Sequence, residues 1–194
     1  FLMAAPFTVR RIAADAATAN GLARIEFSHA QGFPSGDVEY WQSATLVTTG
    51  SEADVTYSEN EEALFGELKV SEDALANTEA ATQRAYALIE SLLAARGYPH
   101  LLRCWNFLHD LHRGAGDAER YKQFVAGRYR AWSARPGFEQ RLPAATVIGC
   151  AGPGLRIYFL AARPPRPALE TPRRPPAREY PRASRPARPS LPPA

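Results

Sequence analysis

Strand and helix patterns alternate in the middle of the chain, and this order restricts the fold to a sheet covered by helices. Apolar and polar residues alternate, or β-branched and aromatic residues cluster, in four runs that we predict to be strands: ALFGELKV (63–70), HLLRCWNFL (100–108), AATVIGC (144–150) and LRIYFLAA (155–162). Helical spacing separates the first run from the second and the second from the third. We therefore predict an α+β fold, with a mixed β-sheet and helices packed on one face of it.

The two predicted helices have recognisable ends. The first begins after Ser71, a favourable N-cap, and ends near Gly97, because glycine readily adopts the left-handed conformation that closes a helix. The second runs from about Asp117 to Ala134 and contains Gly127. Glycine inside a helix costs about 1 kcal/mol relative to alanine. We expect a close approach of another backbone to explain this residue.

Less regular patterns flank this unit. The run GPG (152–154) predicts a hairpin between the last two strands, and three short runs before residue 63 predict further strands: TVRRI (8–12), ARIEFSHA (23–30) and SATLVTT (43–49). After Ala162 no periodicity remains. We predict one domain over residues 1–162 and a disordered Pro/Arg-rich tail over residues 163–194.

Charge and motifs limit the classes of function. The tail holds eight Arg and two Glu, a net charge of +6, so the total of +3 leaves −3 for residues 1–162. A basic arm for nucleic acid is one interpretation, but Lys clusters and nucleic-acid motifs are missing, so we favour a solvated linker. Cys104 and Cys150 lie in apolar runs, which favours a reduced, cytoplasmic setting. We find no membrane-spanning run and no spacing typical of a metal or cofactor site.

Several polar groups occur inside otherwise apolar patterns. Arg103 and Asn106 lie in the strand 100–108, where an arginine can bind a carboxylate through two hydrogen bonds and an asparagine can both donate and accept. The second helix adds Tyr121 and Arg128, whose spacing places them on one face. These residues are candidates for binding a small anion. The alternative is structural: Arg103 pairs with an acid of the protein, and Asn106 ends the strand.

A long motif resembles the chorismatase family. The run GYPHLLRCWNFLHDLHRGAGDAERYKQFVAGRYRAW (97–132), then LPAATVIGC and LRIYFLAA, is similar to that family, as is FGELKVSEDAL (65–75). The resemblance covers about Leu64 to Glu170 well and the first sixty residues loosely. Chorismatases split chorismate into pyruvate and either a hydroxybenzoate or a dihydroxycyclohexadiene carboxylate. The resemblance therefore implies a chorismate-cleaving enzyme of secondary metabolism or pigment biosynthesis, without a cofactor.

The resemblance also implies two related α+β halves, each similar to the RidA-like (YjgF-like) fold, with a catalytic Glu toward the C-terminal half. Here Tyr180, Pro181 and Arg182 match a family YPR segment, but the residues after them depart from the pattern. We therefore expect mostly the N-terminal domain, inactive by itself, with a truncation or a frame change behind the departure. The catalytic residue stays unknown, and the alternative is a non-catalytic RidA-like binding or oligomerisation module. Residues expected to position chorismate are Arg103, Asn106, Tyr121, Arg128, Thr146, Gly149, Tyr158 and Tyr180.

Overall fold

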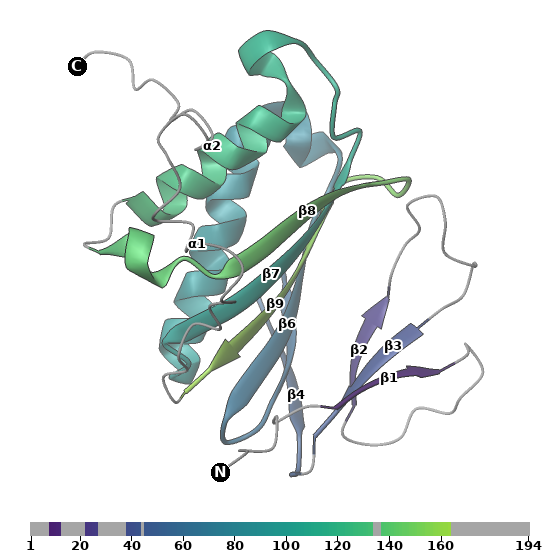
Figure 1. Cartoon of the computed structure of the whole chain (residues 1–194), viewed down its shortest axis with the longest axis vertical. Helices are drawn as coiled ribbons and strands as arrows, with labels where there is room; N and C mark the ends of the chain where they lie inside the picture. The colour runs from purple at the N-terminus through teal and green to yellow at the C-terminus, as the bar shows by residue number, and fades with distance from the viewer. Residues whose placement is uncertain (1–7, 13–21, 27–37, 44, 134–136, 164–194) are drawn as a thin grey trace, which may run out of the picture.

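A twisted six-stranded sheet carries two long helices on one of its faces (Figure 1). The computed structural model describes residues 8–12, 22–26, 38–43, 45–133 and 137–163. The strands follow the order β4-β5-β6-β9-β7-β8. Their bounds are β4 Thr48–Glu52, β5 Val55–Glu59, β6 Ala63–Val70, β7 His100–His109, β8 Ala144–Cys150 and β9 Leu155–Ala162. The predicted α+β fold is confirmed, and the four central strands match their predicted runs to within one residue.

The predicted hairpin between the last two strands is wrong. β9 pairs with β6 and β7, whereas β8 pairs with β7 in parallel at the edge of the sheet. Parallel pairing follows because a helix connects β7 to β8, and such a crossover returns the chain in the same direction. The GPG turn therefore crosses the end of β7, where the His109 N–H donates to the Gly154 carbonyl (2.9 Å).

The helices begin and end close to their predicted bounds. The first helical pattern is a 3₁₀ turn, η1 (Asp73–Asn77), followed by α1 (Thr78–Arg96). The Asn77 side chain caps α1, and Gly97 closes it with a positive φ of 75°. The second pattern is a short 3₁₀ turn, η2 (Gly116–Ala118), and then α2 (Arg120–Ser133). A third 3₁₀ turn, η3 (Phe138–Arg141), leads toward β8.

Gly127 lies where α2 approaches the backbone of α1. A Cβ added to this residue would lie 2.9 Å from the Thr82 Cβ and 3.1 Å from the Gln83 nitrogen, and closer still to the Glu79 carbonyl oxygen. Real Cβ atoms do not approach other atoms at less than 3.0 Å, so only glycine fits here without a shift. The close backbone approach expected from the sequence is confirmed.

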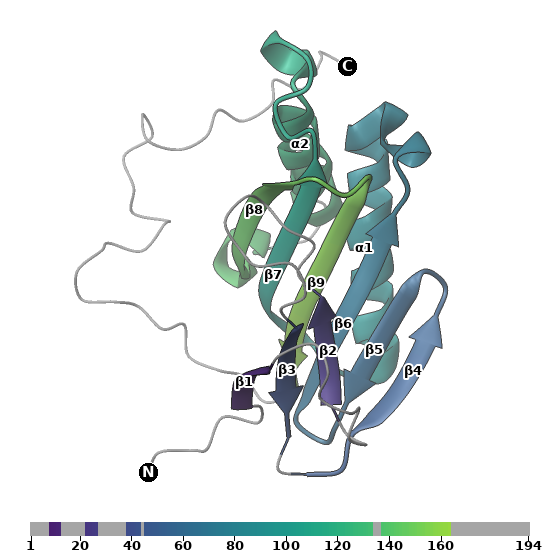
Figure 2. The same cartoon turned by 90° about the vertical axis from the view of Figure 1, so that its right-hand side faces the viewer.

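A second, smaller sheet lies on the side of the large sheet away from the helices (Figures 1 and 2). It has the order β1-β3-β2, and its strands are β1 Thr8–Ile12, β2 Leu22–Glu26 and β3 Val38–Gln42. The predicted runs 8–12 and 23–30 correspond to β1 and β2, whereas β3 was not predicted. The predicted strand 43–49 contributes only its last two residues to β4.

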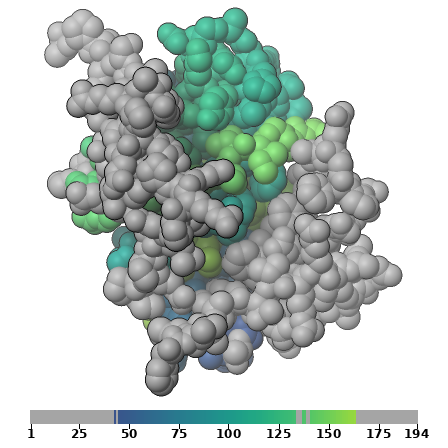
Figure 3. Space-filling model, in the orientation of Figure 1, coloured from purple at the N-terminus to yellow at the C-terminus, as the bar shows by residue number. Residues whose placement is uncertain are grey.

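The GPG turn reaches the surface beside the loop between β7 and α2 (Figure 3).

The main core lies between the sheet and the helices. Leu64, Leu68 and Phe159 point from the sheet toward Ile89 and Phe124 of the helices, and all five side chains are buried. Removing this much apolar surface from water is the main stabilising contribution to the fold. None of the helices in the described part of the chain is long and apolar enough to cross a membrane.

Candidate functional site

The sheet separates the predicted binding residues into two groups. Successive side chains of a strand point to opposite faces, so Arg103 of β7 lies on the face away from the helices. Tyr158 and Thr146 are both register partners of Trp105 and share this face. Asn106 lies on the helix side. The predicted residues therefore do not form one cluster, and Tyr180 lies outside the described residues.

On the helix side, Asn106 belongs to a buried hydrogen-bond network. Its Oδ1 accepts from the Tyr86 hydroxyl (2.8 Å), and its Nδ2 donates to the Thr146 carbonyl (2.8 Å). Burial raises the pKa of the Tyr86 phenol well above its usual range. Both ends of the Asn106 amide are thus used within the protein, as buried polar groups must be to avoid an energetic penalty. This placement supports a structural role for Asn106, although the residue lies inside β7 and does not end the strand as the structural alternative had it.

The other helix-side candidates differ in their surroundings. The Arg128 guanidinium carbon lies 5.8 Å from the Phe124 ring centroid and 5.5 Å from that of Trp132, distances typical of cation–π contacts. Gly149 faces Leu111 at an ordinary distance, 3.6 Å for an added Cβ. Tyr121 is 40% exposed in the first turn of α2, so it does not share the partly buried environment of Arg128.

On the opposite face, four aromatic rings from three adjacent strands come together: Phe65 of β6, Tyr158 of β9, and Trp105 and Phe107 of β7. We call this set the aromatic face. The Phe65 and Tyr158 rings stack with centroids 6.1 Å apart, and Phe107 meets Tyr158 edge-on at 6.0 Å. Burial raises the pKa of the Tyr158 hydroxyl well above its usual range, so it acts as a neutral donor and acceptor.

Charged side chains border the aromatic face. The Arg103 guanidinium carbon lies 5.2 Å from the Trp105 ring centroid, and this arginine is exposed. Arg156 Nη1 lies 3.4 Å from the Tyr158 hydroxyl, and Arg156 Nε lies 3.4 Å from Glu67. Phe65, Phe107 and Tyr158 are buried, so Trp105 is the ring of this face that is partly exposed. Guanidinium groups beside it suit a planar anion, because Arg pairs with carboxylates and also stacks.

Sequence analysis missed Arg156 and Phe65 as members of this face. The signal was present, since Phe65 and Glu67 in β6, and Arg156 and Tyr158 in β9, each follow the period of two that places residues on one side. What the sequence did not contain was the strand order. Only because β9 lies between β6 and β7 do these residues become neighbours of Arg103.

A separate cluster of charges ties together one end of the sheet. The buried Arg120 donates to Glu72 (2.7 Å) and to the His109 carbonyl (2.8 Å), and Glu72 also accepts from the Gly154 N–H (2.8 Å). The hydrogen bond from Arg120 is the main cause that lowers the pKa of Glu72. This cluster fixes η1, α2 and the GPG turn to one another. It holds Glu72 ionised, which is unsuitable for a proton donor.

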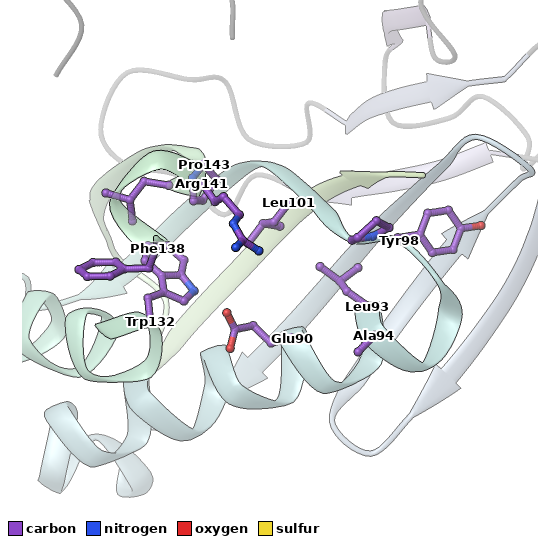
Figure 4. Close-up of a pocket in the computed structure, with 11 residues that line it drawn as sticks. Glu90, Leu93, Ala94, Tyr98, Leu101, Trp132, Phe138, Arg141 and Pro143 are labelled. Carbon is purple, nitrogen blue, oxygen red and sulfur yellow. The ribbon is translucent and has the colours of Figure 1, made fainter. Parts of the chain in front are cut away.

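No set of three or more His, Cys, Asp or Glu side chains within the described residues could hold a metal ion. A groove of about 260 Å³ lies on the helix side, between α1, the end of α2 and the segment that leads into β8 (Figure 4). None of the seven predicted binding residues that lie within the described part of the chain lines it.

Comparison with known proteins identifies the family. Residues 39–161, which include most of the large sheet and both helices, match the model for the N-terminal part of FkbO/Hyg5-like chorismatases. The chain belongs to this chorismatase family. A chorismatase from Streptomyces rapamycinicus is 35% identical over 126 residues, which is 64% of this chain and 37% of that protein. A 3-hydroxybenzoate synthase from Streptomyces hygroscopicus is 40% identical over 112 residues, 56% of this chain and 33% of that protein.

A solved chorismatase structure agrees with the family. A chorismatase crystal structure aligns with a TM-score of 0.67 at 25% identity, over 82% of this chain and 54% of that one. A YjgF-family protein from Neisseria meningitidis aligns over 62% of the chain with a TM-score of 0.41. The chain spans about a third of the length of the curated chorismatases that it matches.

Proposed function

We propose that this chain is the N-terminal part of an enzyme that cleaves chorismate to pyruvate and a hydroxybenzoate or a dihydroxycyclohexadiene carboxylate. The observation that carries the proposal is the family match over residues 39–161, which includes every strand of the aromatic face. Relatives named chorismatase and 3-hydroxybenzoate synthase support it. We place the protein in the cytoplasm, which suits its two free cysteines.

The aromatic face is the part of this unit that we assign to the substrate. Chorismate is a ring compound with two carboxylates, and such a ligand needs fixed cations and a flat apolar surface. Arg103 and Arg156 provide guanidinium groups, and the partly buried Trp105 provides a ring beside Arg103. A hydrogen bond between a guanidinium group and a carboxylate is about twice as strong as one between neutral groups. We assign Arg103 and Arg156 to substrate binding, and the buried Tyr158 to holding Arg156 in place.

Cleavage of the enol ether needs a proton on the enolpyruvyl group and a water that attacks the adjacent carbon, after which pyruvate and a ring hydroxyl separate. A carboxyl group with a raised pKa is the usual donor. Glu72 does not fit this role, because its pKa is lowered and it lies in the cluster at the end of the sheet. We therefore assign the aromatic face to binding, and we do not assign Glu72 to proton transfer.

Calorimetry with chorismate and a coupled assay for pyruvate test the proposal on the full chain. We expect chorismate to bind, and Arg103→Gln and Arg156→Gln each to weaken binding by about tenfold through loss of a charge-assisted contact. Arg84→Gln is the matched control, because Arg84 is exposed on α1, on the helix side of the sheet. Absence of binding would leave a non-catalytic module. Pyruvate release at an enzymatic rate by this chain alone would contradict the purely binding role.

A further inference from the structure

The groove on the helix side has the lining of a site for proline-rich peptide. It runs from Trp132 and Phe138 at one end to Tyr98 at the other, with Leu93 and Leu101 between them (Figure 4). The Tyr98 ring itself is buried and points away from the groove. Pro99 and Pro143 add further rigid apolar surface. Segments in the polyproline II conformation bind such aromatic-lined grooves, because their backbone is already extended and little entropy is lost on binding.

The chain leaves the sheet at the Tyr98 end of this groove. β9 ends at Ala162, which pairs with His100 at the start of β7. The next residue, Arg163, places its guanidinium carbon 4.6 Å from the Tyr98 ring centroid, and its N–H donates to the Glu62 carbonyl (2.9 Å). Arg163, the residue before the proline-rich segment, therefore lies beside Tyr98 at this end of the groove.

The composition of those residues matches the groove. Residues 164–176 (PPRPALETPRRPP) contain six prolines in thirteen positions, with the spacing P-x-x-P at Pro164–Pro167 and again at Pro172–Pro175. The segment has three Arg and one Glu. The groove lining includes one carboxylate, that of Glu90, and one guanidinium group, that of Arg141, and both have partners within the protein. Residues 1–162 have a net charge of −3, opposite to the +6 of the whole tail.

We propose that residues 164–176 of this chain bind in the groove formed by α1, α2 and η3, in the polyproline II conformation and within the same molecule. At about 3.1 Å per residue, the five residues that follow Arg163, up to Ala168, extend about 15 Å along the groove from Tyr98. This docking covers the exposed Leu142 and the partly exposed Leu101 and Phe138. It is independent of chorismate binding, because it involves the opposite face of the sheet.

Disulfide trapping in the full chain tests the proposal. Leu142 lines the groove and is 49% exposed, so Leu142→Cys with Ala168→Cys should cross-link within one molecule under mild oxidation. Ile148→Cys with Ala168→Cys is the matched control, because Ile148 is 41% exposed on β8 and does not line the groove. Leu142→Cys with Ala187→Cys is the control for a tail position beyond the segment. All variants carry Cys150→Ser.

We expect the groove pair to cross-link at least about tenfold faster than either control, because docking raises the effective concentration of the two thiols. Replacing Pro164 and Pro167 by Ala should remove this advantage while thermal unfolding stays unchanged. Equal rates for the three pairs would overturn the proposal. Cross-linked dimers in place of monomers would overturn the same-molecule arrangement and assign the groove to the tail of a second copy.

Trypsin digestion gives a second measurement on the unmodified chain. The bonds after Arg173 and Arg182 are not followed by proline, so both are trypsin sites, and only the first lies in the proposed segment. Cleavage after Arg173 should be about tenfold slower than cleavage after Arg182, because a bound segment must first dissociate from the groove. Equal cleavage at both sites would contradict docking even if a cysteine variant failed to fold.

Discussion

Gly127→Ala tests how closely α1 and α2 pack. Two effects oppose each other at this position. Alanine is favoured over glycine in a helix by about 1 kcal/mol. The added Cβ, however, lies 2.9 Å from the Thr82 Cβ and closer still to the Glu79 carbonyl oxygen. A backbone oxygen cannot rotate away as a side chain can, so the helices must separate, and overpacking of a core costs about 1–3 kcal/mol.

We expect the steric cost to win, with a net loss of up to about 2 kcal/mol in the free energy of unfolding. For a chain of this length, a loss of about 2 kcal/mol corresponds to a decrease of about 4–8 °C in Tm. Urea unfolding measures the loss as a lower midpoint at unchanged slope. Gly149→Ala is the control, because its added Cβ would lie 3.6 Å from Leu111. We expect it to stay within about 0.5 kcal/mol of the wild type. A Gly127→Ala variant at least as stable as the wild type would refute the packing argument.

Two further predictions concern the polar groups inside the fold. Asn106→Ala leaves both the Tyr86 hydroxyl and the Thr146 carbonyl without their partner, so we expect urea unfolding to show a loss of about 3 kcal/mol or more, against about 1 kcal/mol for Tyr86→Phe. If Tyr86→Phe lost more free energy of unfolding than Asn106→Ala, the result would contradict the hydrogen-bond network. The pKa of Glu72 is lowered by Arg120, so its contribution to stability is complete above the ordinary pKa of 4.5 and is lost as the pH falls through the lowered value. Glu72→Gln should therefore lose less stability than the wild type between about pH 5 and pH 3. If the stability of the variant and of the wild type fell equally over this pH range, ionised Glu72 would not be a source of the stability.

The candidate site shows where inference from local patterns ends. Arg103 and Asn106 are three residues apart, so the alternation of a strand already places them on opposite faces. The structure assigns the buried network to Asn106 and the aromatic face to Arg103. Arg156 joins Arg103 on that face only because a strand about fifty residues later in the chain lies beside β7. Pairing of this kind is non-local, and no pattern within β7 or β9 specifies it.

The amino-acid sequence by itself determined the extent of the four central strands, the end of α1 at Gly97, the close approach at Gly127 and the family to which the chain belongs. These features depend on backbone sterics and on apolar periods within about ten to twenty residues, which the sequence contains directly. Only the tertiary structure decided that β9 lies between β6 and β7, and therefore which side chains share a face. Backbone hydrogen bonds are alike for any pair of strands, so the order depends on burial summed over the whole sheet and both helices.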